Sequence, residues 1–208
     1  MHEACGIFGI YAPNEDVARL TFFALFALQH RGQESAGIAT TDGDQIRIYA
    51  EMGLVSQVFS EESLSSLGGD IAIGHNRYST SGSSRIANVQ PIVVGKGTRH
   101  FALAHNGNIT NAEYLQQGLT EQGYAFRSST DSEVVANLIL SAPGEDCVAR
   151  VRYAMNRLQG AYSLGIMSRD SLYAVRDPLG VRPLCLGSIN GSWLIASETC
   201  ALDHLGAN

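Results

Sequence analysis

The sequence lacks the features that mark a membrane protein, a metal site or a secreted scaffold. No apolar run reaches the ~18 residues that span a bilayer, and no basic segment followed by an apolar stretch marks a signal peptide. Cysteine is scarce, and no CxxC pair occurs. This argues against zinc binding or a disulfide framework and favours a cytoplasmic protein with free thiols. Three of the cysteines are expected to fill space in the core: Cys147, Cys185 and Cys200.

Charge is scarce as well. Only 16% of the residues are charged, and the formal net charge is −6. Without a basic cluster, nucleic acid is not an expected partner. The apolar content of 45% is typical of a globular chain. A chain of 208 residues can bury roughly 70% of its unfolded surface, which favours one domain with a sizeable core.

Apolar periodicity predicts strands at both ends of the chain and helices in the middle. This order favours an α+β layered fold. The last four expected strands are joined by short turns, which favours antiparallel sheets. Strands are expected at 5–12, 35–41, 45–52, 69–77, 99–109, 160–168, 171–177, 183–189 and 192–198, and helices at 16–31, 111–123, 132–142 and 147–158.

Two helices carry further local signals. Helix 16–31 has apolar residues on nearly every side, which predicts a broad buried face. Thr130 and Glu133 have the spacing of a capping box, which predicts a helix start near Asp131.

Cys5 is the first candidate for chemistry, because it opens an alternating apolar strand. A thiolate is a strong nucleophile when a base takes the thiol proton. Removal of residues 1–4 would give Cys5 its own α-amine, whose pKa near ~7.7–8 suits that task. The alternative is an ordinary buried strand cysteine.

Three further positions have both a structural and a chemical interpretation. Asn106-Gly107 is a hairpin-turn signal, or an amide and an N–H that stabilise an oxyanion. Arg77 is a surface arginine, or a bidentate ligand for a carboxylate. Asp131 is a carboxylate that the dipole at a helix N-terminus stabilises, or a ligand for an ammonium group. Arg77 and Asp131 together would recognise the two charged ends of an amino acid.

Eight sequence blocks resemble the glutaminase domain of amidophosphoribosyltransferases, in the same order from Cys5 to about Leu205. They are CGIFGIY, LQHRGQESAGI, IGHNRYSTSG, ALAHNGNITN, SSTDSEV, LQGAYSL, RDPLGVRPL and ASETCALD. LQHRGQESAGI points to this family over the related sugar-amidating and asparagine-forming families. The resemblance implies an N-terminal-nucleophile hydrolase, a four-layer αββα sandwich of two antiparallel sheets.

The resemblance also implies roles. Cys5 is the nucleophile and its freed α-amine the base, so that residues 1–4 form a leader and residues 5–208 the domain. Asn106 and Gly107 form the oxyanion hole, and Arg77 and Asp131 bind the α-carboxylate and α-ammonium of glutamine. The remaining implied positions are Arg31 and Gly32 beside the nucleophile, and Tyr78, Ser79 and Thr80 at the start of a glutamine loop, with Thr80 as a glutamine contact.

One departure from the family is large. Its second, phosphoribosyltransferase domain is not present in these residues, and no glycine-rich phosphate loop occurs. We therefore expect an excised domain, or a natural or reconstructed fragment, without the synthetic half-reaction. We expect neither an iron–sulfur cluster nor another cofactor in it. RDPLGVRPL is expected to be a structural turn between strands.

Hydrolysis of glutamine is the leading functional hypothesis. One alternative is a catalytically silent folding or interaction unit that needs processing or its partner domain. Another is a hydrolase for a different amide, against which the pairing of Arg77 with Asp131 argues.

Overall fold

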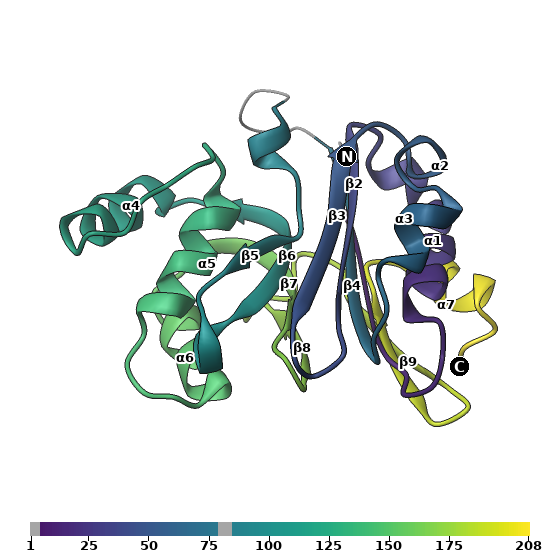
Figure 1. Ribbon diagram of the computed structural model, residues 1–208. Helices are drawn as coiled ribbons and strands as arrows, with labels where there is room; N and C mark the ends of the chain where they lie inside the picture. The colour runs from purple at the N-terminus through teal and green to yellow at the C-terminus, as the bar shows by residue number, and fades with distance from the viewer. Residues whose placement is uncertain (1–4, 79–84) are drawn as a thin grey trace.

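The computed structural model describes residues 5–78 and 85–208. They form two antiparallel sheets packed face to face, with a helical layer on each outer side (Figure 1). The predicted α+β fold, with its four layers, is confirmed. None of the helices in the described ranges has the length and apolar character needed to cross a membrane.

One sheet has six strands in the order β3-β2-β4-β1-β10-β9. Helices α1, α2, α3 and α7 lie beside it, at the right of Figure 1. The strands are β1 (Gly6–Tyr11), β2 (Ser35–Thr41), β3 (Ile46–Met52), β4 (Ile71–Arg77), β9 (Cys185–Ile189) and β10 (Ser192–Ala196), and the helices are α1 (Val17–Ala27), α2 (Val55–Val58), α3 (Glu61–Ser65) and α7 (Thr199–His204).

The other sheet has four strands in the order β5-β6-β7-β8. Helices α4, α5 and α6 form the opposite outer layer, at the left of Figure 1. The strands are β5 (Ile92–Val94), β6 (Phe101–Ile109), β7 (Gly160–Met167) and β8 (Leu172–Arg176), and the helices are α4 (Ala112–Glu121), α5 (Asp131–Ser141) and α6 (Cys147–Met155).

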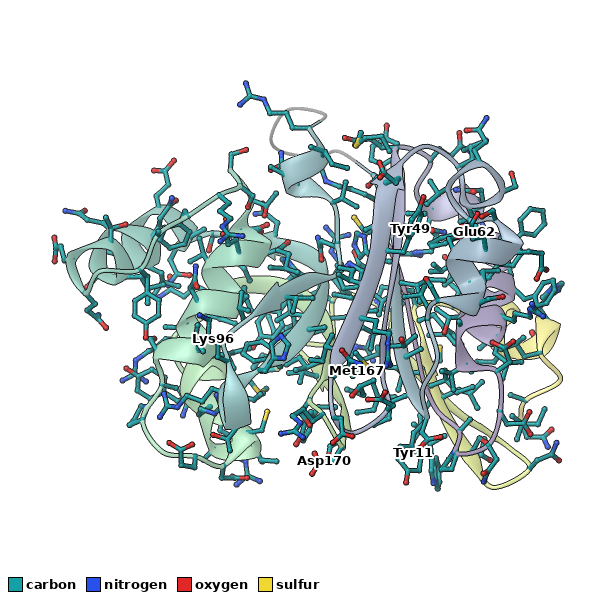
Figure 2. All side chains as sticks on the ribbon, viewed as in Figure 1. Tyr11, Tyr49, Glu62, Lys96, Met167 and Asp170 are labelled. Atoms are coloured by element: carbon teal, nitrogen blue, oxygen red, sulfur yellow. The ribbon has the colours of Figure 1, made fainter. Side chains whose placement is uncertain are left out.

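Side-chain alternation along the strands divides the core into layers. Odd positions of β1 and β4 and even positions of β6 face the gap between the sheets. There they form a small apolar cluster, here called the interior cluster, in which Met167 is completely buried (Figure 2). It consists of Ile7, Ala39, Ile71, Ile73, Ala102, Ala104 and Met167. The intervening residues, such as Phe8 and Leu103, face the two helical layers.

Helix α1 has the predicted buried face, which includes Val17, Thr21 and Leu25, while Phe23 and Phe26 are 46% and 52% exposed. One prediction about helices needs correction. Helix α5 begins at Asp131 as predicted, but Thr130 makes no side-chain cap. Glu133 instead accepts hydrogen bonds from the N–H groups of Arg127 and Ser128, because its carboxylate reaches back past Thr130 into the preceding loop.

Asn106-Gly107 is not a hairpin turn. Both residues lie inside β6, where they pair with Ser163 and Tyr162 of β7. The strand continues because a distant segment supplies partners for its backbone groups.

The cysteines and the proline-bounded loop behave largely as predicted. Cys5, Cys147, Cys185 and Cys200 are free thiols; Cys147 is buried, whereas Cys185 and Cys200 are half-buried at the edge of a core cluster. RDPLGVRPL forms the turn between β8 and β9. Asp177 holds it by accepting hydrogen bonds from the N–H groups of Leu179 and Val181.

Candidate active site

The candidate nucleophile and its predicted partners lie at one end of the gap between the sheets. Cys5, Arg77 and Asn106 continue the alternation that places the interior cluster in this gap. Strand β1 runs antiparallel to β4, so Gly6 pairs with Asn76 and the start of β1 lies beside the end of β4. Tyr11, at the other end of β1, is labelled at the lower edge of Figure 2.

The Cys5 thiol is half-buried against the backbone of Tyr78. Its Sγ lies 3.6 Å from Tyr78 O, to which the thiol donates, and 3.5 Å from Tyr78 N, which donates to the sulfur. Burial raises the pKa of the thiol, although the Tyr78 backbone and the charges of Arg77 and Arg31 oppose the rise. With Cys5 still in peptide linkage, the protonated thiol is therefore favoured, and a base is needed to activate it.

Arg77 is held rigidly. Its side chain is only 4% exposed and forms an ion pair with Glu34, which directly precedes β2. Glu34 N also donates to Arg77 O at 3.1 Å. Two attachments between the same residues fix the guanidinium at the edge of the pocket, as recognition of a carboxylate requires.

Asp131 joins α5 to β6 at the other side of the pocket. Its Oδ2 accepts a hydrogen bond of 2.9 Å from Ile109 N, and its Oδ1 lies 3.7 Å from His105 Nδ1. Burial lowers the pKa of His105, although the Asp131 charge opposes this. A neutral imidazole leaves the negative charge of Asp131 available to a cation.

Asn106 and Gly107 have the features expected of an oxyanion hole. Asn106 is 1% exposed, and its Nδ2 has no hydrogen-bond partner in the part of the chain that the structure describes. Such an orphaned buried donor is costly unless a ligand accepts from it. A Cβ at Gly107 would lie 2.2 Å from Ala161 O and 2.7 Å from His105 Nε2, so only glycine fits.

Arg31 and Gly32 hold the segment after α1 against Cys5 and β4. Arg31 follows α1 in a short 3-10 helix (Gln29–Arg31), and its Nε donates to Cys5 O at 3.1 Å. Gly32 packs on the backbone of β4, where a Cβ would lie 2.7 Å from Asn76 O.

Cys5, the end of β4, strand β6 and the start of α5 line a small cavity of about 30 Å³. It is lined by Cys5, Arg77, Tyr78, Gln90, His105, Gly107, Thr130, Asp131 and Ser132.

Five residues were not predicted as part of this site: Glu34, Gln90, His105, Thr130 and Ser132. Gln90 Oε1 accepts from His105 N at 2.7 Å, and Gln90 Nε2 donates to Ser132 Oγ at 3.0 Å. Glu34 holds Arg77. All of them except Gln90 lie in the sequence blocks, within two positions of a residue that was predicted, and that closeness was the available signal. Gln90 carries no local signal.

Some predicted positions lie outside the described residues. These are residues 1–4, the expected leader, and Ser79 and Thr80 of the expected glutamine loop.

Comparisons with known proteins identify the family to which this chain is similar. Residues 75–204 match the model of a glutamine amidotransferase domain. Amidophosphoribosyltransferases of Synechococcus elongatus and Methanocaldococcus jannaschii are 50% and 48% identical over 99% and 98% of this chain. The chain spans 43% and 44% of those two relatives.

Solved structures share the fold. The glutamine phosphoribosylpyrophosphate amidotransferase of B. subtilis superposes with a TM-score of 0.91 at 40% identity, over 98% of this chain and 44% of that one. A structure described as the allosteric regulatory enzyme of purine biosynthesis gives a TM-score of 0.93 at 41% identity, with the same coverage. The predicted N-terminal-nucleophile hydrolase fold is thereby confirmed, and the chain belongs to the glutamine amidotransferase domain family.

Proposed function

We propose that this chain hydrolyses glutamine to glutamate and ammonia, with Cys5 as nucleophile. The observation that carries the proposal is the convergence of Cys5, Arg77 and Asp131 on one small cavity. Arg77 would bind the α-carboxylate and Asp131 the α-ammonium of the substrate. Its side-chain amide would then face the thiol, beside the orphaned Asn106 amide.

The reaction follows from these positions. The α-amine of a freed Cys5 accepts the thiol proton, and the thiolate attacks the side-chain carbonyl carbon of glutamine. Asn106 Nδ2 and Gly107 N–H stabilise the oxyanion that forms. The carbon–nitrogen bond breaks as the α-ammonium returns its proton to the departing ammonia. Water then attacks the thioester, and glutamate leaves as the thiol is restored.

The base in this mechanism requires processing. A peptide-bonded Cys5 nitrogen is an amide and accepts no proton at neutral pH, so we propose that residues 1–4 form a leader that is removed. Intact mass and glutamate release, measured on one sample, test this step. Full activity from protein whose mass still includes residues 1–4 would rule out the amine as base.

Substitution of the nucleophile tests the activity itself. We expect the processed chain to release glutamate from glutamine, and Cys5→Ala to abolish the release. Substitution of half-buried Cys185 by Ala serves as the matched control, because this thiol lies in β9, on the second strand away from β1. Processed wild-type protein without glutaminase activity would favour the alternative of a silent interaction unit.

We further propose that the chain is the ammonia-supplying part of a cytoplasmic amidophosphoribosyltransferase in purine biosynthesis. The names of the relatives and the 43% coverage of the first of them support this. A phosphoribosyltransferase domain would be its partner, and this chain would need no cofactor of its own.

The proposal of a partner phosphoribosyltransferase domain can be tested on the 208 residues alone. Phosphoribosyl pyrophosphate should not stimulate glutamate release, because a ligand without a binding site cannot shift a conformational equilibrium. A several-fold stimulation would place such a site within this chain and contradict the proposal that this site belongs to a partner phosphoribosyltransferase domain.

A further inference from the structure

Glu198, which directly precedes α7, lies between two basic side chains next to the nucleophile. Its Oε1 accepts a hydrogen bond from Arg31 Nη1, and its Oε2 lies 2.8 Å from His30 Nε2. Burial raises the pKa of Glu198, but the hydrogen bonds from Arg31 and His30 outweigh it and the net pKa is lowered. Glu198 is therefore a carboxylate at neutral pH.

Through Arg31 this carboxylate reaches the nucleophile's backbone. Arg31 is only 10% exposed, and its Nε donates to Cys5 O at 3.1 Å. The carbonyl carbon, the nitrogen and the Cβ of Cys5 are all bonded to one Cα. Fixing the carbonyl therefore restricts the directions of the thiol and the α-amine.

The residue before Glu198 is attached to the same strand. Ser197 Oγ accepts from Ile7 N at 2.9 Å, and Ser197 N donates to Ile7 O at 2.9 Å. Ser197 thus holds β1 directly, while Glu198 acts on Cys5 through Arg31. The residues at the end of β10 therefore fix the position of the start of β1.

The same cluster has donor atoms of a kind that bind metals. Among the described residues, His30, Glu198 and Cys200 have donor atoms within 4.8 Å of one another. Arg31, however, places a permanent positive charge on the shared carboxylate, which opposes the entry of a divalent cation. The geometry favours orientation of Arg31 over metal binding.

We propose that Glu198 is a positioning residue for Cys5, acting through Arg31. This inference rests on the proposed glutaminase function. Neither Arg31 nor Glu198 lines the cavity that would hold glutamine. Loss of Glu198 should therefore lower kcat and leave KM within about twofold of wild type.

The experiment compares Glu198→Gln and Glu198→Ala in protein whose intact mass matches a chain that starts at Cys5. Gln keeps an oxygen that accepts from Arg31, whereas Ala removes it. We expect kcat to fall on the order of tenfold for Gln and further for Ala, since small misplacements of reacting groups are costly. Glu145→Gln is the matched control: Glu145 also pairs with an arginine, Arg99, but near α6.

A second measurement keeps the test independent of turnover. The rate at which iodoacetamide alkylates Cys5 should fall in both Glu198 variants and stay unchanged in the control. Absence of glutaminase activity in wild type would defeat the proposed function, and alkylation would still decide the role of Glu198. Unchanged kcat and alkylation in both variants would overturn the inference, as would loss of wild-type activity on treatment with a chelator.

Discussion

Asp131 contributes to folding and to the proposed chemistry through different oxygens. Oδ2 accepts from the backbone of β6, which locks the start of α5 against that strand. Oδ1 lies 3.7 Å from Nδ1 of His105, and burial lowers the pKa of that histidine. The carboxylate thus keeps its place whether or not a substrate ammonium is present.

Asp131→Asn should therefore weaken glutamine binding more than it weakens the fold. The amide oxygen can still accept from Ile109 N, but the negative charge is lost. We expect KM to rise at least tenfold, since a hydrogen bond to a charged group contributes about 1.5–3 kcal/mol. Steady-state kinetics and thermal unfolding of the same sample check this, and an unchanged KM would remove Asp131 from the substrate site.

At the scale of elements, the site depends on how closely the segment after α1 approaches β4. Gly32 has an ordinary extended backbone, with φ of −158°. Its importance is steric, because a Cβ there would meet three backbone atoms of Asn76 and Arg77 at 2.7 Å. Backbone atoms of a central strand cannot move aside as a flexible side chain can.

Gly32→Ala should displace the end of β4 and with it Arg77. We expect kcat/KM for glutamine to fall by at least tenfold, on the scale set by misplacement of binding groups. Gly118→Ala in α4 is the control, since a Cβ there meets nothing within 4 Å. Equal activity of the two variants would show that the approach of Gly32 does not position Arg77.

At the scale of the whole molecule, packing two sheets face to face buries titratable groups. His75 is completely buried between them, and its Nε2 lies 3.1 Å from His105 O. Burial lowers its pKa to about 3; the hydrogen bond to His105 O opposes this lowering, and the positive charge of Arg77 adds to it. An unfolded chain would have this histidine near ~6.5.

Stability should therefore fall as the pH is lowered. Between about pH 6.5 and 3 the unfolded chain binds a proton at His75 that the folded chain does not, whereas above this range neither does. From pH 7 to 5 the free energy of unfolding should fall by about 2 kcal/mol on account of His75. Urea unfolding at both pH values measures it.

Two variants identify the group responsible. His75→Gln should reduce this loss of stability by about the amount assigned to His75, whereas substitution of the exposed His204 by Gln should leave it unchanged. A wild-type free energy of unfolding equal at pH 7 and 5 would contradict the assignment.

The sequence by itself determined the layered α+β class and most of the elements. Alternation and helical spacing are local properties, so they predict β1, β4 and α5 without knowledge of their neighbours. It also identified Cys5, Arg77 and Asp131 as candidates, because each is a chemically reactive or charged residue at the predicted start or end of a strand or helix. The resemblance then joined these residues into one site, and its αββα sandwich is the fold observed.

Only the tertiary structure decided which distant side chains hold that site together. Glu34 pairs with Arg77 across 43 positions, and Glu198 with Arg31 across 167. The same holds for Asn106, whose strand continues because β7 pairs with it. Local sequence patterns specify how a segment folds but not which remote segment will lie against it. The choice is made when the two sheets bury their apolar faces together, since burial of apolar surface is the main force that drives the packing.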